Sequence, residues 1–108
     1  MGEYSLGEFQ ELVLLIVAAL DKEAYGVAIL KNLEKETSKK FNISAIHVAL
    51  KRMEEKGFVE SHYGGITNER GGRRKKYYLL TALGKKILDE QYELRTRIYQ
   101  RIPKISLG

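Results

Sequence analysis

A short segment with five cations carries the clearest chemistry in this sequence. Residues 70–76 contain no acidic residue. The whole chain has 19 basic and 14 acidic residues, so removing these five leaves 14 of each, and the segment carries the entire net charge of +5. A concentrated positive patch favours a polyanionic partner. The five cations are Arg70, Arg73, Arg74, Lys75 and Lys76.

A polar face on a predicted helix is the second such feature. Apolar residues recur at helical spacing from Ile46 to Met53, and Asn42 or Ser44 can cap a helix that reaches about Lys56. The opposite face offers cations for phosphates or guanine edges, hydrogen-bonding groups for phosphates or bases, and a valine for a thymine methyl. This face consists of Ser44, Val48, Lys51 and Glu55, with His47 and Arg52 on its flanks.

Both features also have a simpler interpretation. The polar face could be the solvated side of an amphipathic helix, and the cationic segment could be a solvated, glycine-rich loop. Their combination favours DNA, because a helix in the major groove and cations along the backbone are complementary ways of binding a duplex.

Other chemistry is poorly supported. The chain has no cysteine, which excludes disulfides and thiol nucleophiles. His47 and His62 fall on different predicted elements, and the glycines lack phosphate-loop spacing, so we expect no catalytic site, metal or cofactor. The longest apolar run, residues 12–20, is nine residues long, well below the roughly 20 that span a bilayer. We expect a cytoplasmic protein of one domain.

The elements that must position these residues follow from hydrophobic periodicity. Ser5 and Glu8 have capping-box spacing before a helix that ends near Leu20 and is apolar nearly all round, which predicts burial on several sides. A second, amphipathic helix is predicted from about Tyr25 to Thr37. After the predicted helix that reaches about Lys56, Gly57 followed by Phe58 fits a C-terminal cap with a left-handed backbone conformation.

Two strands and a last helix complete the prediction. Residues 59–63 and 76–80 are rich in β-branched and aromatic residues and flank a segment of turn residues, which predicts a hairpin. Thr81 can cap a final helix that reaches about Ile102. The predicted fold is mainly α with a small β-hairpin: a winged helix-turn-helix over residues 1–80, followed by a C-terminal helix and tail over 81–108.

Several segments resemble the PadR family of transcriptional regulators. Residues 6–15 are similar to the opening of that family, 24–29 to the start of its second helix, 50–59 to the end of its recognition helix, and 69–78 with Leu80, Thr81 and Gly84 to its wing. Together they cover nearly the whole chain.

The resemblance implies a regulator of double-stranded DNA, usually a repressor, that acts as a homodimer with its last helix as the dimerisation helix. The two-fold symmetry of such a dimer predicts a palindromic operator. It also implies that Tyr25, which opens the second helix, reaches a phosphate, although packing beneath that helix is an equal alternative. The final helix has more apolar residues than one stripe packed on the core of a protomer would need, which is typical of a helix that also pairs with a second copy. Candidate interface residues, which could instead complete the core of one protomer, are Leu6, Phe9, Leu83, Ile87, Leu94, Ile98 and Ile102.

Two departures from the family pattern concern function. His47 stands where members typically carry a tyrosine in the recognition helix. Some short members bind planar drugs through a tryptophan, which this chain lacks. The sequence therefore identifies no small-molecule effector, although Tyr92, Tyr99 or Phe9 could line a small pocket. A winged-helix module that binds an acidic protein, or a nonspecific architectural DNA-binding protein, are the rival functions.

Overall fold

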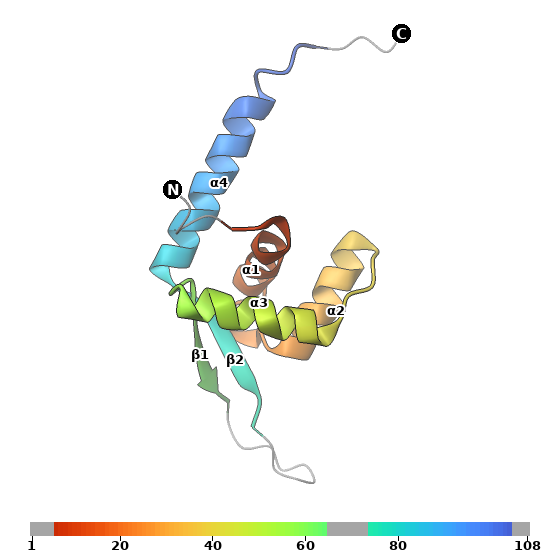
Figure 1. Ribbon diagram of the computed structural model, residues 1–108, viewed down its shortest axis with the longest axis vertical. Helices are drawn as coiled ribbons and strands as arrows, with labels where there is room; N and C mark the ends of the chain where they lie inside the picture. Colours follow the sequence, from red (N-terminus) through yellow and green to blue (C-terminus); the bar gives the residue numbers. More distant parts are fainter. Residues whose placement is uncertain (1–5, 65–73, 105–108) are drawn as a thin grey trace.

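A computed structural model of the chain describes residues 6–64 and 74–104. Three helices are followed by a two-stranded hairpin and a long last helix (Figure 1). This is the predicted order, and the mainly helical winged fold is confirmed. The elements are α1 (Glu8–Leu20), the short 3-10 turn η2 (Asp21–Glu23), α2 (Gly26–Thr37), α3 (Ile43–Glu55), β1 (Val59–Tyr63), β2 (Lys76–Leu80) and α4 (Ala82–Tyr99).

The start of α1 differs from the prediction. Gly7 occupies the N-cap position, and its carbonyl accepts a hydrogen bond from the backbone N–H of Glu11 at 2.9 Å. A capping box at Ser5 would have placed Gly7 inside the first turn, where glycine is unfavourable, whereas a cap position tolerates it. Ser5 itself lies outside the described residues.

The end of α3 follows its sequence pattern closely. Gly57 has a φ of +83°, a left-handed conformation that glycine adopts without strain. Its N–H donates to the carbonyl of Glu54, and the N–H of Phe58 donates to the carbonyl of Met53. This pair of bonds is a Schellman motif, which satisfies the last carbonyls of the helix and turns the chain into β1.

One hydrophobic core joins the three helices to the base of the hairpin. α1 is less buried than its composition predicted, because Leu15 remains 44% exposed and Ala19 is exposed as well. The core residues are Val13, Leu14, Ile16, Val17, Ala24, Ile29, Leu33, Ile46, Ala49, Leu50, Met53, Phe58, Val59, Tyr78, Ile87 and Leu88.

The hairpin is antiparallel and is attached to the helical body by its second strand. Val59 pairs with Leu80 and Tyr63 with Lys76. The N–H of Tyr78 donates to the carbonyl of Ala24 at 2.8 Å, and Tyr25 forms an isolated antiparallel bridge with Tyr77. The segment before α2 thus holds β2 and fixes where the wing leaves the body.

The last helix extends away from the rest of the molecule (Figure 1). Thr81 caps it by accepting a hydrogen bond from the N–H of Gly84. It ends at Tyr99, slightly before the predicted Ile102, because the N–H groups of Arg101 and Ile102 bond to carbonyls three residues back, in a tightened last turn. Among the described residues, no helix is long and apolar enough to cross a membrane.

Candidate nucleic-acid interface

The predicted reading face of α3 is exposed as a unit. Asn42 caps the helix, and its side-chain oxygen accepts from the backbone N–H of Ser44 at 2.8 Å and from the Ser44 hydroxyl at 2.6 Å. The opposite side of α3 is buried in the core. The exposed residues include Ser44, His47, Val48, Lys51, Arg52 and Glu55.

His47 lies where three elements meet. A Cβ added to Gly26 would be 2.8 Å from Cε1 of His47, so the imidazole rests directly on the first residue of α2. On one side His47 lines a hollow of about 330 Å³ with Tyr25 and Lys75. On the other side it lines a hollow of about 410 Å³ with Lys51 and Glu54. The histidine therefore joins the reading face to the wing.

Tyr25 packs against the wing at the start of α2, and its contact with a phosphate stays a prediction. It is the N-cap residue of α2, but its side chain makes no capping bond. Its ring packs edge-on against Tyr77, with centroids 5.5 Å apart. The ammonium group of Lys75 lies 4.3 Å from the centroid of the same ring, within the range of a cation–π interaction. Tyr25 is half-buried, and it holds a cation of the wing next to the start of α2.

The cations of the wing fall into two groups. Arg74 and Lys75 are exposed immediately before β2 begins. Lys76 is half-buried, and its ammonium lies 3.9 Å from a carboxylate oxygen of Glu54 on α3. Its charge is thus partly balanced within the protein. The predicted contacts Arg70 and Arg73 lie outside the described residues.

Tyr78 and Glu54 anchor the base of the wing to α3. Burial raises the pKa of Tyr78 above its ordinary value of 10.0; Lys76 opposes this shift and Glu54 adds to it. The other carboxylate oxygen of Glu54 accepts from the Ser61 hydroxyl at 2.5 Å. These contacts fix the wing relative to the reading face.

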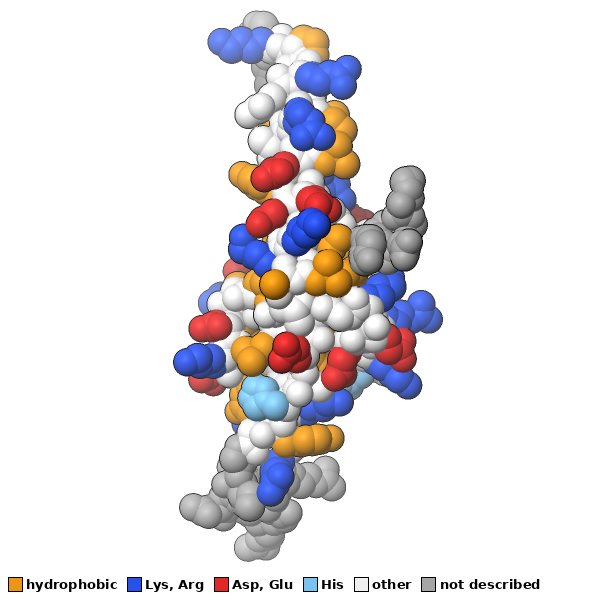
Figure 2. Space-filling model, turned by 90° about the vertical axis from the view of Figure 1, so that its left-hand side faces the viewer, with side chains coloured by type: hydrophobic (Ala, Val, Ile, Leu, Met, Phe, Trp, Pro, Cys, Tyr) orange, Lys and Arg blue, Asp and Glu red, His pale blue; other side chains and the backbone are white. Residues whose placement is uncertain are grey.

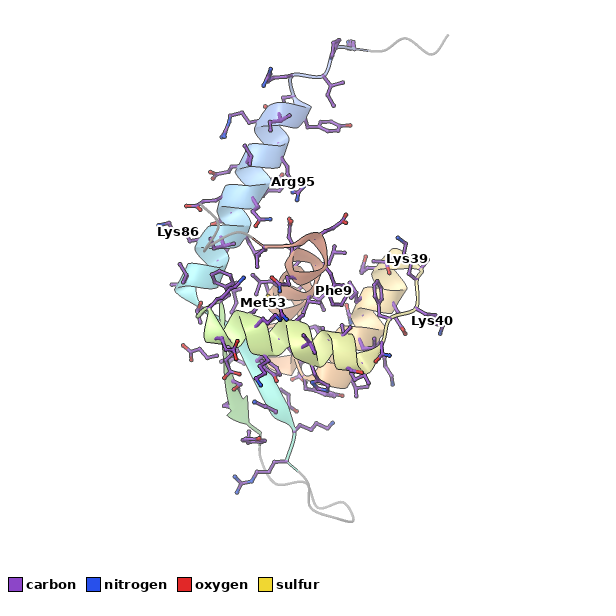
Figure 3. All side chains as sticks on the ribbon, viewed as in Figure 1. Phe9, Lys39, Lys40, Met53, Lys86 and Arg95 are labelled. Carbon is purple, nitrogen blue, oxygen red and sulfur yellow. The ribbon has the colours of Figure 1, made fainter. Side chains whose placement is uncertain are left out.

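Two further cations lie in the turn before α3. Lys39 and Lys40 are exposed in the turn between α2 and α3 (Figure 3). The turn is ordered by its neighbours, since the N–H of Phe41 donates to the carboxylate of Glu34 at 2.8 Å. In the sequence they are a pair of cations followed by Phe41 and then by the Asn42 cap of α3.

The predicted dimer residues divide between the core and the surface. Ile87 is buried within the protomer, and three others are half-buried against its core. The exposed ones are at the far end of the chain: Leu94 is 47% exposed, Ile98 51% and Ile102 54%. Figure 2 shows hydrophobic side chains exposed along α4 beyond the body. The three half-buried candidates are Leu6, Phe9 and Leu83.

Phe9 also lines an open groove of about 870 Å³ between the start of α1 and one flank of α3. Val48, Arg52 and Lys56 form part of its α3 side.

Within the described residues, no group of three or more histidines, cysteines or carboxylates could hold a metal ion.

Comparisons with known proteins match this arrangement to one family. A family model of PadR-like transcriptional regulators matches residues 13–90. A PadR family transcription regulator from hypervirulent Clostridium difficile R20291 is 33% identical, with a TM-score of 0.71 over 87% of this chain and 93% of that chain. The chain belongs to the PadR-like family of transcriptional regulators. The resemblance seen in the sequence is thereby confirmed.

Other relatives of this PadR-like chain are consistent with that assignment. A protein of Lysinibacillus sphaericus, described as uncharacterized protein X, is 33% identical over 86 residues, which are 78% of this chain and 74% of that protein. The crystal structure of a PadR-like transcriptional regulator from Bacillus cereus is 21% identical and has a TM-score of 0.69 over 85% of this chain and 84% of that one; it supports the fold alone. Membership of the family implies DNA-binding regulation.

Proposed function

We propose that this PadR-like regulator binds a palindromic operator as a homodimer and acts as a repressor. One observation carries the proposal: the exposed face of α3 lies beside the cationic end of the wing, and His47 connects the two. A duplex offers base edges in its major groove and phosphates along its rim, so one surface can contact both.

In this proposal α3 reads the bases. Lys51 and Arg52 contact guanine edges or nearby phosphates, and Val48 packs on a thymine methyl. Ser44 and His47 donate to a phosphate or a base edge. All five side chains are exposed on one face of α3, which is what groove reading requires.

The wing and the start of α2 bind the backbone. Arg74 and Lys75 are exposed and have phosphates as their natural partners. The Tyr25 ring positions the Lys75 ammonium, and its hydroxyl lies near the N-terminus of α2 for a further phosphate contact. Lys76 contributes less, because Glu54 partly neutralises its charge. On the sequence argument, Arg70 and Arg73 belong to the same set.

Dimerisation rests on α4. Leu94 and Ile98 are exposed on a helix that projects beyond the body, and Ile102 is exposed just after its end. A second copy related by a two-fold axis would cover them and would hold two reading helices at a defined separation. Exposed Leu15 on α1 extends the apolar surface available to the partner. We assign residues 1–80 to DNA binding and 81–108 to dimerisation.

Selection of bound sequences from random duplex DNA at near-physiological salt tests the proposal. The wild type is compared with an R73A/R74A/K75A variant and with a control variant, K35A/K86A/R97A, which removes three cations from α2 and α4. We expect a two-fold symmetric motif from all three proteins. The wing variant should lose affinity, with its slope of log affinity against log salt reduced by about 2.7 per protomer, or 0.9 for each lost contact.

Two outcomes would contradict the proposal. Binding without any preferred motif would indicate an architectural DNA-binding protein. Absence of DNA binding, with retention of an acidic protein partner, would indicate a winged-helix interaction module, because such a partner supplies charge but no base edges. Repression itself is tested by a reporter gene whose promoter overlaps the selected motif; increased expression in the presence of the regulator would contradict it.

A further inference from the structure

Glu11 links the body of the protein to α4. Its carboxylate oxygen Oε1 accepts from Nε2 of Gln91 at 2.7 Å and from the guanidinium of Arg95 at 3.1 Å. The two donors are 80 and 84 positions away in the sequence but only one turn apart on α4. The Glu11 side chain is only 15% exposed, and Figure 3 shows Arg95 on the side of α4 that faces α1.

The base of α4 is fixed at a separate place. The Thr81 hydroxyl donates to the carbonyl of Gly57 at 2.6 Å. Gly84 lies so close to Phe58 that an added Cβ would be 2.2 Å from the Phe58 carbonyl oxygen. The first part of α4 is therefore seated on the turn between α3 and β1.

Between these two places α4 is held by hydrophobic packing. Ile87 and Leu88 are buried against the core. Such packing is not directional and permits small tilts, whereas a carboxylate with two donors requires particular geometry. Beyond Arg95, the residues of α4 are exposed apart from half-buried Thr96. Glu11 is thus the last polar contact between α4 and the body in the described residues.

The direction of α4 has a large effect at its far end. Its 18 residues make it about 27 Å long at 1.5 Å per residue. A tilt of about 10° about the base would move that end by about 5 Å, more than the 3.4 Å rise of one base pair. In a dimer joined through this end, the same tilt changes the separation of the two reading helices.

We propose that Glu11 is a positioning residue that sets the direction of α4 and thereby the half-site spacing that the dimer recognises. This inference rests on the proposed function, because spacing has meaning only for a dimer that binds two half-sites. The geometry of Glu11, Gln91 and Arg95 carries it within each protomer.

Glu11 can also stabilise α1 itself, so a control variant must separate this effect from its contact with α4. Glu8 and Glu11 both lie in the first turn of α1, where a negative charge stabilises the helix through its dipole. E8A removes this effect at an exposed residue of the same turn, whereas E11A removes it together with the contact to α4. A difference between the two variants therefore reports on α4.

The first test measures spacing preference. The selected half-site is placed in inverted pairs separated by every spacer length across two helical turns, and binding of the wild type, E8A, E11A and R95A is compared. We expect the wild type and E8A to prefer one spacing, and E11A to accept neighbouring spacings with its preference reduced by about tenfold. R95A should behave similarly but more weakly, because Gln91 still donates to Glu11.

The second test measures the direction of α4 without DNA. Because the chain has no cysteine, spin labels can be attached at K22C and Q100C, both on exposed residues. Labelled protein is diluted into an excess of unlabelled protein, so that pulsed dipolar spectroscopy reports the distance within one protomer. We expect a narrow distance distribution in the wild type and in E8A, and a broader one in E11A.

The two tests separate the two proposals. If no half-site exists but E11A broadens the distance distribution, the proposed function fails while Glu11 still positions α4; the inference about spacing is then overturned. If half-sites exist and E11A keeps both the spacing preference and the narrow distribution, Glu11 has no positioning role. Broadening together with relaxed spacing supports the full inference.

Discussion

Two surfaces of this protein are exposed to solvent for opposite reasons. The face made by α3 and the wing presents cations and hydrogen-bonding groups, while the far end of α4 and the turn after it present Leu94, Ile98 and Ile102. Polar groups can remain in water at no cost, but covering exposed aliphatic side chains lowers the free energy of the system. The first surface suits a charged ligand, and the second suits another protein surface.

The difference has a measurable consequence in salt. DNA binding at the cationic surface, as proposed, would release counterions from DNA, so the affinity for DNA should fall steeply as salt rises. Burial of aliphatic side chains releases no ions and depends weakly on salt. Because the two surfaces lie on separate elements, each can be changed without the other.

Salt should produce the largest contrast between them. Between about 50 and 200 mM salt, we expect operator affinity to fall by about 10³-fold, whereas the dimer dissociation constant changes by less than about threefold. Fluorescence anisotropy of labelled DNA and analytical ultracentrifugation of the free protein measure the two quantities. Equal salt dependence of both would show that the dimer is held by charges rather than by the apolar end of α4.

Ile98→Glu should disrupt the proposed dimer surface without changing any residue of the DNA-binding surface. Burial of an unpaired carboxylate costs several kcal/mol, so we expect the dimer to weaken by at least about 100-fold, with folding retained. Operator binding should weaken in parallel, because a monomer holds only one half-site. The control Arg97→Glu changes charge by more on the neighbouring residue and should preserve the dimer; if it dissociates as well, the Ile98 result reflects charge and not a lost apolar contact.

Gly26→Ala tests whether His47 belongs to the DNA-binding surface. The new methyl group would meet the His47 imidazole, a flexible side chain that can move away, so folding should be retained. A displaced His47 would lose its proposed hydrogen bond to DNA, which predicts a reduction in operator affinity of about three- to tenfold. His47→Ala should have a similar effect, and the double variant should add little further loss. Additive losses in an affinity titration would show that Gly26 acts independently of His47.

Local patterns in the sequence predicted most of the fold. The Asn42 cap, the turn at Gly57, the two strands and the Thr81 cap each depend on a few adjacent residues, and the structure has all of them. The capping box predicted at Ser5 was wrong, because Gly7 stands at the N-cap position of α1, and a cap position tolerates glycine.

Contacts between distant segments were not predictable. Nothing in the sequence indicates that His47 rests on Gly26, or that Lys76 lies beside Glu54. The pairing of Glu11 with Arg95 spans 84 positions. The candidate interface residues show the same limit: periodicity identified the apolar residues of α4, but only packing shows that Ile87 is in the core while Ile98 is exposed.

The base of the wing should give the smallest effect, visible only at high pH. Burial raises the pKa of Tyr78 above 10.0 in the folded protein, with Lys76 opposing and Glu54 adding to the shift. As pH rises past 10.0, the unfolded chain therefore loses this proton first, and the contribution of Tyr78 to stability, complete at lower pH, is lost until the folded protein also titrates. Tyr78→Phe should remove this part of the decline in urea unfolding measured across that range. Tyr92→Phe removes an exposed hydroxyl on α4 and should keep the wild-type decline; an identical decline in wild type and Tyr78→Phe would mean that the base of the wing is solvated like the surface of α4.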